Sequence, residues 1–278
     1  MIPVLLDLKF IKIYTFGIFL VLAFFWGAFI LWKNYLLTAQ KEEELFDGMF
    51  LSLAGGLFIG RLVYVIANFQ EFGFDILRFI LINGYPGLSM YGFLFGALLT
   101  LGLYFSSKKI EYKEVIDYVI PSIFLSLSIG KLGSFLSGTE VGEKTKFLIS
   151  LRYSGIDGAR HLTSLYESLL FFLGFYISYK LLFAIRRGVF PKGFGLYFFL
   201  WFFSLIYFAL DSIKTNKILM FGISFNSFIS LILLLTFSFY YVYHFRRSLF
   251  QSFNLFKKIN KKNYGKKDVK SGNKKEKG

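Results

Sequence analysis

The sequence predicts an all-α, polytopic membrane protein with about seven transmembrane helices. Hydrophobic residues make up 55% of the 278 residues, and Phe alone contributes 39. The mean hydropathy is +0.57. A soluble domain of this length has no use for so much apolar surface. The apolar stretches each approach the ~20 residues that a helix needs to cross the hydrocarbon core, and they fall at about 10–32, 48–69, 86–106, 115–136, 162–184, 194–213 and 218–243.

The first apolar stretch is predicted to be a retained helix rather than a cleaved signal peptide. It is longer than the apolar core of about 7–15 residues that signal peptides carry. No A-x-A-like cleavage site follows it. We therefore expect this helix to remain part of the membrane domain.

The composition excludes several kinds of site. The chain has no cysteine, which excludes disulfides, thiolate metal sites and a cysteine nucleophile on the protein itself. His161 and His244 are the only histidines, so no histidine pair has the spacing of metal ligands. Neither a G-x-S-x-G motif nor a P-loop occurs. We therefore expect neither a metal nor another cofactor.

Basic residues concentrate at the C-terminus. The net charge is +15, and the stretch from Arg246 to Lys277 contains twelve Lys or Arg against two acidic residues. No aromatic-interleaved recognition motif accompanies these charges, so nucleic acid is not an expected partner. The sequence predicts a membrane domain over residues 1–249 and a basic, disordered cytoplasmic tail over 250–278 that attracts anionic lipid.

The same charges predict the orientation of the chain. With the tail inside, seven helices place the N-terminus outside, and most Lys and Arg of the short loops then lie inside, as the positive-inside rule requires. Two longer loops, 69–86 and 137–161, fall on the outer side. The second alternates apolar and polar residues, so it is predicted either to form a short hairpin or to lie along the membrane surface.

Charged side chains within the predicted spans mark a candidate site. Arg61 interrupts the second span and Lys131 the fourth, and a cation costs about 2.5–3.5 kcal/mol at the centre of a membrane helix. Snorkelling to the lipid surface is one explanation for Arg61, but its mid-helix position favours a polar cavity that holds an anion. Asp211 and Lys214 have the spacing of a pair within one helix. The pattern indicates a site for an anionic group such as a phospholipid headgroup, and leaves open a lipid-modifying enzyme, a transporter and a sensor.

Five segments, in order along the chain, resemble the bacterial prolipoprotein diacylglyceryl transferase family. The first contains Gly60, Arg61 and Tyr64, which read G-R-x-x-Y and resemble the G-x-R-x-x-Y of the family. The segments are EEELFDGMFLSLAGGLFIGRLVYVIANF, GYPGLSMYGFLFGALL, DYVIPSIFLSLSIGKLGSFLSGTEVG, RHLTSLYES and IYFALDSIK, and the third is similar to the family signature. The resemblance extends from about residue 14 to residue 217.

The resemblance implies an enzyme of the bacterial plasma (inner) membrane. Such a transferase moves a diacylglyceryl group from phosphatidylglycerol to the lipobox cysteine of a secreted lipoprotein precursor, forming a thioether and releasing glycerol phosphate. The chemistry needs a base for the thiol and cations for the departing phosphate. Two alternatives stay open: a non-catalytic relative that binds lipid or precursor, and an unrelated seven-helix transporter or sensor.

The resemblance also assigns the candidate residues. Three groups able to accept the thiol proton are the catalytic candidates: Glu140, Tyr91 and His161. Arg61 and Lys131 are expected to bind the lipid phosphate together. The full set predicted to bind phosphatidylglycerol is Arg61, Lys131, Ser134, Ser137, Gly142, Tyr64, Tyr166, Glu167, Tyr207, Asp211 and Lys214.

At several of these positions the chain departs from the family pattern. Lys131 stands at the signature Arg, which keeps the charge but loses the bidentate fork. Tyr91 stands at a family His, so a side chain with a pKa near ~10 replaces one that titrates near neutrality. Glu140 lies one place after the family Glu. Two Asn and one Arg of the pattern are replaced by Ser134, Ser137 and Tyr207.

Overall fold

The computed structural model describes residues 3–7, 12–81, 84–153, 156–215, 217, 219–220 and 222–246. This part of the chain contains seven helices that are long and apolar enough to cross a membrane, which confirms the predicted fold class and helix number. The chain divides into two compact units, residues 1–234 and 235–278, which are described separately. The tail predicted over residues 250–278 lies outside the described residues.

Seven long helices and several short elements make up the described chain. The long helices are α1 (Thr15–Tyr35), α2 (Glu42–Ala67), α5 (Met90–Ser107), α6 (Tyr112–Ser137), α7 (Thr163–Arg186), α8 (Phe194–Asp211) and a last helix, Phe225–Arg246. Two short helices, α3 (Phe69–Phe72) and α4 (Ile76–Ile80), follow α2. Three antiparallel hairpins are formed by β1 (Val4–Asp7) with β2 (Lys12–Tyr14), β3 (Ser150–Arg152) with β4 (Ala159–His161), and β5 (Leu219–Met220) with β6 (Ile223–Ser224).

Helix boundaries differ from the sequence prediction in two places. The first helix begins at Thr15 rather than near residue 10, because Lys12–Tyr14 form strand β2, which pairs with β1. The second begins at Glu42 rather than near residue 48, since its first turn holds three glutamates, and acidic side chains stabilise a helix N-terminus. The β3–β4 pairing confirms the hairpin predicted within 137–161.

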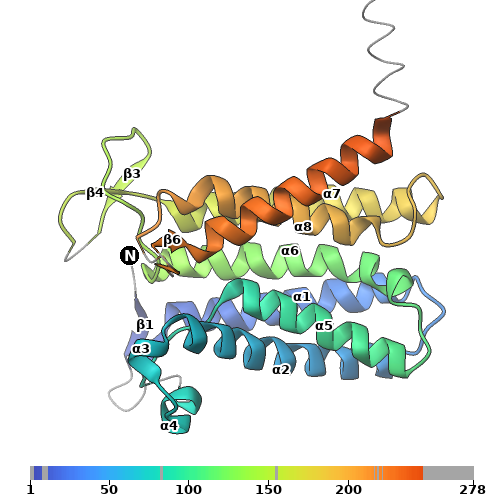
Figure 1. The fold of residues 1–278 in the computed structure, drawn as a ribbon, viewed down its shortest axis with the longest axis horizontal. Coiled ribbons are helices and arrows are strands. Elements are labelled where there is room, and N and C mark those ends of the chain that lie inside the picture. The colour runs from blue at the N-terminus through green and yellow to red at the C-terminus, as the bar shows by residue number, and fades with distance from the viewer. Residues whose placement is uncertain are drawn as a thin grey trace, which may run out of the picture. The chain divides into compact units, whose positions relative to one another are not determined.

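Within the first unit, α6 is the central helix. It packs along α1 on one side and along α7 on the other, while α2 packs along α5 (Figure 1). The α2–α5 contact depends on small residues: a Cβ added at Gly92 would lie 3.0 Å from the Gly60 Cα. Glycines therefore let the two backbones approach closely, as is common between helices in lipid.

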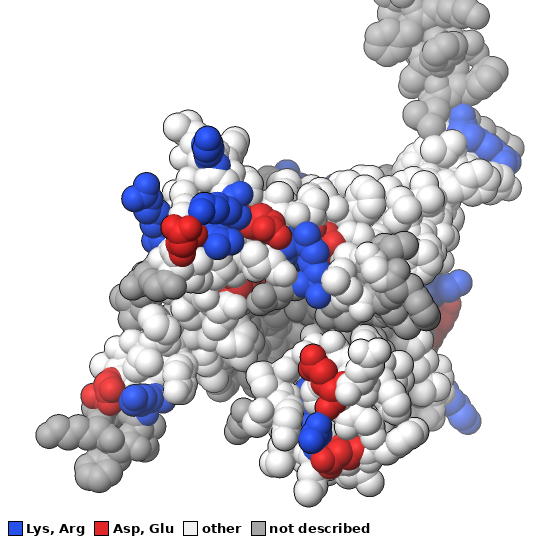
Figure 2. All heavy atoms as spheres, turned by 60° about the vertical axis from the view of Figure 1, so that its left-hand side comes forward, with Lys and Arg blue, Asp and Glu red and all other residues white. Residues whose placement is uncertain are grey.

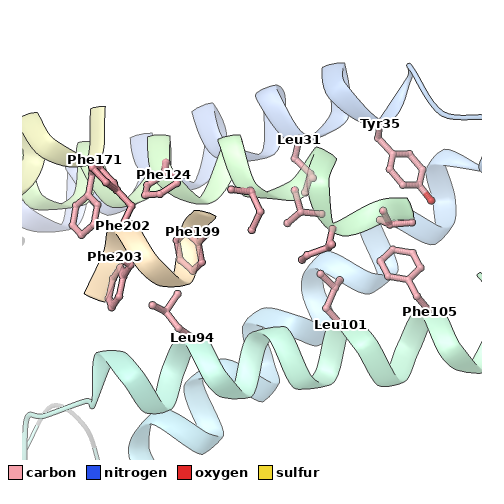
Figure 3. Packing of buried hydrophobic residues seen from close by; sticks show 14 of the residues in the cluster. Leu31, Tyr35, Leu94, Leu101, Phe105, Phe124, Phe171, Phe199, Phe202 and Phe203 are labelled. Carbon is pink, nitrogen blue, oxygen red and sulfur yellow. The ribbon is translucent and has the colours of Figure 1, made fainter. Parts of the chain in front are cut away.

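Aromatic side chains form much of the core between α6, α7 and α8. Phe124 is fully buried and lies 5.0 Å from Phe199 and 6.4 Å from Phe171 between ring centroids. Figure 3 shows these rings with Phe202 and Phe203 at one end of a single cluster whose other end includes Leu31, Tyr35 and Phe105. The stacked column continues from Phe203 to Tyr207. This packing fixes α8 against α7 where the candidate site residues begin.

Asp117 anchors the start of α8 from within α6. Its side chain is buried and accepts hydrogen bonds from the backbone N–H groups of Gly193, at 2.6 Å, and Gly195, at 2.8 Å. A Cβ added at Gly195 would lie 2.7 Å from Asp117 Oδ1. A carboxylate at a helix N-terminus also interacts favourably with the helix dipole.

Replacing Asp117 with Ala is expected to destabilise the protein by about 1–3 kcal/mol, because two buried N–H groups lose their acceptor. Thermal unfolding in detergent measures the loss. Glu114→Gln is the matched control, since Glu114 lies on the same helix but forms only an exposed ion pair with Lys192. Equal melting temperatures for Asp117→Ala and the wild type would refute the anchoring role.

Candidate active site

The predicted site residues gather at one end of the first unit, called the hairpin end below. Here α6 ends, α7 begins, and the β3–β4 hairpin connects them (Figure 1). Viewed from this side, Lys and Arg side chains gather over the hairpin, with a few acidic groups beside them (Figure 2).

Lys131 is a buried cation held between two carboxylates. Its Nζ lies 2.7 and 2.9 Å from the two oxygens of Glu140 and 2.8 Å from Glu167 Oε2. The local fold explains the first contact, because Gly138 ends α6 in a left-handed conformation with φ 74°. The chain then turns back, and Glu140 reaches the helix it has just left.

Glu167 links the two lysines of the site. It lies in α7, its side chain has no solvent exposure, and it forms ion pairs with both Lys131 and Lys214. Lys214 follows α8 and does not pair with Asp211, whose Oδ2 instead accepts a hydrogen bond from Ser227. The predicted pair within one helix is therefore wrong: the chain leaves the helix at Asp211, and the two side chains diverge.

Tyr207 forms the apolar wall beneath these ion pairs. The ammonium groups of Lys214 and Lys131 lie 4.0 and 5.9 Å from the centroid of its ring. A cation over an aromatic face is attracted by the ring quadrupole. On its other side Tyr207 stacks on Phe203, at 4.4 Å, and contacts the Tyr91 ring edge to face, at 5.6 Å. The Tyr91 hydroxyl shares a hydrogen bond with Ser230 on the last helix.

The four charged groups of this cluster balance one another. Lys131 and Lys214 carry two positive charges, and Glu140 and Glu167 carry two negative ones. Burial alone raises the pKa of the Glu140 carboxyl, but Lys131, with Lys214 and the Ser164 hydroxyl, holds it below the ordinary value. Glu140 is thus an ionised partner of Lys131 at neutral pH. It is also the accessible member, with 40% of its side chain exposed against 7% for Lys131.

Backbone pairing fixes the loop that carries Glu140. Gly142 bridges to Lys214, the Glu143 N–H donates to the Ile213 carbonyl at 2.8 Å, and the His161 N–H donates to the Glu143 carbonyl at 3.1 Å. A Cβ at Gly142 would lie 2.5 Å from the His161 carbonyl oxygen, so only glycine fits there. The segment between α6 and β3 therefore lies between the end of α8 and strand β4.

The remaining predicted residues of this end support the cluster from the sides. Ser134 and Ser137 are buried in the last turn of α6, where the Ser134 carbonyl accepts from the Gly138 and Thr139 N–H groups. Tyr166 donates a hydrogen bond to the Ile149 carbonyl at 2.8 Å. The Nδ1 of His161 has no hydrogen-bond partner among the described residues, and its ring packs against Phe147.

Arg61 occupies a different environment from Lys131. Its guanidinium donates to three backbone carbonyls, those of Phe79 at 2.9 Å, Gly87 at 2.8 Å and Arg78 at 2.7 Å. The rings of Phe72 and Tyr64 lie beside it, at 5.0 and 5.8 Å. Among the described residues, no partner of Arg61 is also a partner of Lys131. The structure thus gives Arg61 neutral acceptors, and its direct contact with a lipid phosphate stays a prediction.

Replacing Arg61 with Lys is expected to loosen the segment between α2 and α5, because one ammonium group cannot satisfy three carbonyls that match the planar fork. Hydrogen bonds to charged groups are worth about 1.5–3 kcal/mol each, so the melting temperature falls and proteolysis at exposed Phe74 accelerates. Arg152→Lys, on the exposed hairpin, is the control. Unchanged proteolysis in Arg61→Lys would exclude this role.

Three serines that lie in the site were not predicted from the sequence to belong to it. Ser164 donates to Glu140 Oε2 at 3.2 Å, Ser227 to Asp211, and Ser230 pairs with Tyr91. Ser227 and Ser230 are spaced i, i+3 in an apolar span, and that spacing was the available signal. No group of three or more His, Asp or Glu able to hold a metal occurs among the described residues.

Comparison with known proteins gives a consistent result. The family model for prolipoprotein diacylglyceryl transferase matches residues 3–243. Three relatives carry the name phosphatidylglycerol–prolipoprotein diacylglyceryl transferase. The Clostridium tetani protein is 28% identical over 67% of this chain and 75% of its own length. The Clostridioides difficile protein is 25% identical over 80% of this chain and 87% of its own length. The Clostridium novyi protein is 26% identical over 84% of this chain and 92% of its own length.

Proposed function

Because the chain belongs to the prolipoprotein diacylglyceryl transferase family, we propose that it transfers a diacylglyceryl group from phosphatidylglycerol to a cysteine thiol of a lipoprotein precursor. The relatives named above carry this activity in their names. The acceptor is the lipobox cysteine that follows a precursor signal peptide. The protein is a multi-pass membrane protein, and we place it in the bacterial inner membrane with the hairpin end outside.

The reaction requires one bond to form and one to break. The precursor thiolate attacks the diacylglyceryl carbon that carries the phosphate ester, forming a C–S bond. The C–O bond to the phosphate breaks, and glycerol phosphate leaves with the electron pair. The thiol proton passes to a base, because only the thiolate is an effective nucleophile. Cations beside the phosphate stabilise the charge that develops on the leaving group.

The observation that carries the proposal is the pair of lysines held by one buried glutamate. Lys131 and Lys214 both contact Glu167, which lacks any solvent exposure. Two cations in a poorly hydrated place would repel one another without an anion between them. Glu167 therefore holds both ammonium groups beside one carboxylate, and we infer that both face the lipid phosphate.

The charge balance of the cluster requires an exchange when lipid binds. Two lysines and two glutamates sum to zero, and the phosphodiester adds one negative charge. One carboxylate must leave the lysines or take up a proton. Glu140 is that group, because it lies on a loop and is 40% exposed, whereas Glu167 is fully buried in α7. The lipid phosphate takes its place on Lys131.

The same exchange converts Glu140 into a better base. While Lys131 holds it, the pKa of Glu140 stays below its ordinary value. Once the phosphate occupies Lys131, that stabilisation of the carboxylate is lost, and the pKa of Glu140 rises toward that of a thiol of about 8.5. Glu140 thus accepts the thiol proton only when lipid is bound. Tyr91 and His161 are the alternative bases.

Complementation tests the proposal. The protein is expressed in cells depleted of their own transferase, and a reporter lipoprotein is examined by mass spectrometry. We expect a mass gain of one diacylglyceryl group on the reporter, lost when its lipobox cysteine is replaced with Ser. An unmodified reporter in cells that contain the folded, membrane-inserted protein would contradict the transferase and favour a non-catalytic relative.

A further inference from the structure

The segment that leads into strand β3 carries an exposed apolar triplet outside the membrane helices. Phe147, Leu148 and Ile149 are 55%, 94% and 53% exposed. Large apolar side chains with this exposure, adjacent in sequence and backed by little of the protein, indicate a contact surface rather than a core. Nothing in the proposed reaction uses them.

The structure ties this triplet to the first turn of a candidate membrane-spanning helix. The Tyr166 hydroxyl donates to the Ile149 carbonyl at 2.8 Å. Tyr166 lies in the first turn of α7, one of the helices long and apolar enough to span the bilayer. At its other end the hairpin is fixed by the Lys144–Arg160 bridge and by the hydrogen bond from the Thr145 N–H to the Ala159 carbonyl. The triplet therefore lies beside the first turn of a helix that can span the membrane.

The charges beside the triplet have one sign. Exposed Lys146 precedes it and exposed Arg152 follows three residues after Ile149, and neither forms an ion pair within the described chain. Lys144, in contrast, pairs with Asp157 at 2.8 Å on the far side of the hairpin. Apolar side chains flanked by unpaired cations are typical of segments that enter an anionic lipid surface.

We propose that residues 146–152 of the hairpin insert into the lipid surface beside the active site and select anionic phospholipid there. The apolar triplet enters the boundary between headgroups and acyl chains, and Lys146 and Arg152 bind lipid phosphates. The occupant is lipid rather than protein, because the triplet is tied to a membrane helix by Tyr166 and the flanking cations complement anionic headgroups. This inference does not depend on the proposed reaction.

Spin labelling tests the insertion, since the chain has no cysteine and a single one is unique. Leu148→Cys and Asp157→Cys are labelled with a nitroxide in the full protein, in nanodiscs of phosphatidylcholine with or without phosphatidylglycerol. Asp157, whose side chain is 92% exposed on the same hairpin, is the matched control. Unchanged thermal unfolding shows that the labels leave the fold intact.

We expect the label at 148 to be relaxed mainly by oxygen and the label at 157 mainly by a water-soluble nickel chelate, with a several-fold difference between them. Phosphatidylglycerol increases the difference, and Lys146→Gln with Arg152→Gln removes that increase, because each cation at an anionic surface contributes about fivefold in affinity. Equal access of the nickel chelate to both positions would overturn the insertion. If the label at 148 were equally accessible to oxygen with and without phosphatidylglycerol, the proposed selection of anionic lipid would be wrong.

Discussion

Replacing Lys131 with Ala is expected to lower the rate of diacylglyceryl transfer by about 100- to 1000-fold, the usual cost of removing one group that stabilises charge developing in the transition state. The substitution leaves Glu140 and Glu167 facing one another with only Lys214 between them. Both the contact with the lipid phosphate and the position of the candidate base are lost. An in vitro assay with phosphatidylglycerol and a cysteine-containing precursor peptide measures the rate.

Two further variants separate charge from general damage. Lys131→Arg keeps the cation and adds a bidentate fork, so we expect activity near or above that of the wild type. Lys144→Ala removes an exposed lysine whose partner is Asp157 on the hairpin, and it should leave transfer unchanged. Normal turnover by Lys131→Ala in a folded protein would exclude Lys131 from the phosphate site.

Replacing Glu140 with Gln is expected to lower the KM for phosphatidylglycerol while reducing kcat. The amide no longer competes with the lipid phosphate for Lys131, so KM falls, by about tenfold if the lost pairing is worth roughly 1.4 kcal/mol. The amide cannot accept the thiol proton, so kcat falls by about 100-fold or more, the usual contribution of a general base. A residue that only supports the fold would not move the two constants in opposite directions.

The pH dependence follows from the direction of the Glu140 shift. Its pKa lies below the ordinary value in the folded protein, so the pair with Lys131 is complete at neutral pH and is lost as the pH falls through that lowered value. In the wild type, the KM for lipid therefore falls toward acid pH. In Glu140→Gln it stays flat over the same range.

The control for both measurements is Asp157→Asn, which removes another carboxylate that pairs with a lysine after α6. Its KM and kcat should match those of the wild type. If Glu140→Gln kept the wild-type KM and pH profile, Glu140 would neither compete with the phosphate nor serve as the base, and Tyr91 or His161 would become the leading candidates.

Composition and spacing were sufficient to predict the helices. Spans of apolar residues near the length of a bilayer predicted seven helices, and the described part of the chain contains seven that could cross a membrane. The first boundary was wrong because the residues before Thr15 are apolar enough to extend a span, yet they pair as the β1–β2 hairpin. Hydropathy measures how apolar a segment is, but it does not show whether the segment forms a helix or pairs with another strand.

The sequence predicted which residues belong to the site, but it did not predict all the contacts between them. Lys131, Glu140, Glu167, Tyr207 and Lys214 were all candidates, and the structure brings them into one cluster. Spacing alone paired Asp211 with Lys214, because it cannot show that the helix ends at Asp211.

The role of Arg61 illustrates a second limit. A cation in the middle of an apolar helix suggested an anion, but the short helix α4 and the loop before α5 present carbonyl oxygens to it. Backbone acceptors carry no signature in the sequence. The sequence alone therefore cannot tell whether a buried arginine binds an anion or donates to backbone carbonyls. The three-dimensional course of the backbone around the arginine decides between the two.

The most direct test of the proposed reaction measures both products in one sample. Purified protein in nanodiscs that contain phosphatidylglycerol receives a precursor peptide with one lipobox cysteine, and mass spectrometry follows the peptide while released glycerol phosphate is assayed. The proposed chemistry requires one glycerol phosphate for each diacylglyceryl thioether, with both products lost in Lys131→Ala. Glycerol phosphate released without peptide modification, or the reverse, would contradict it.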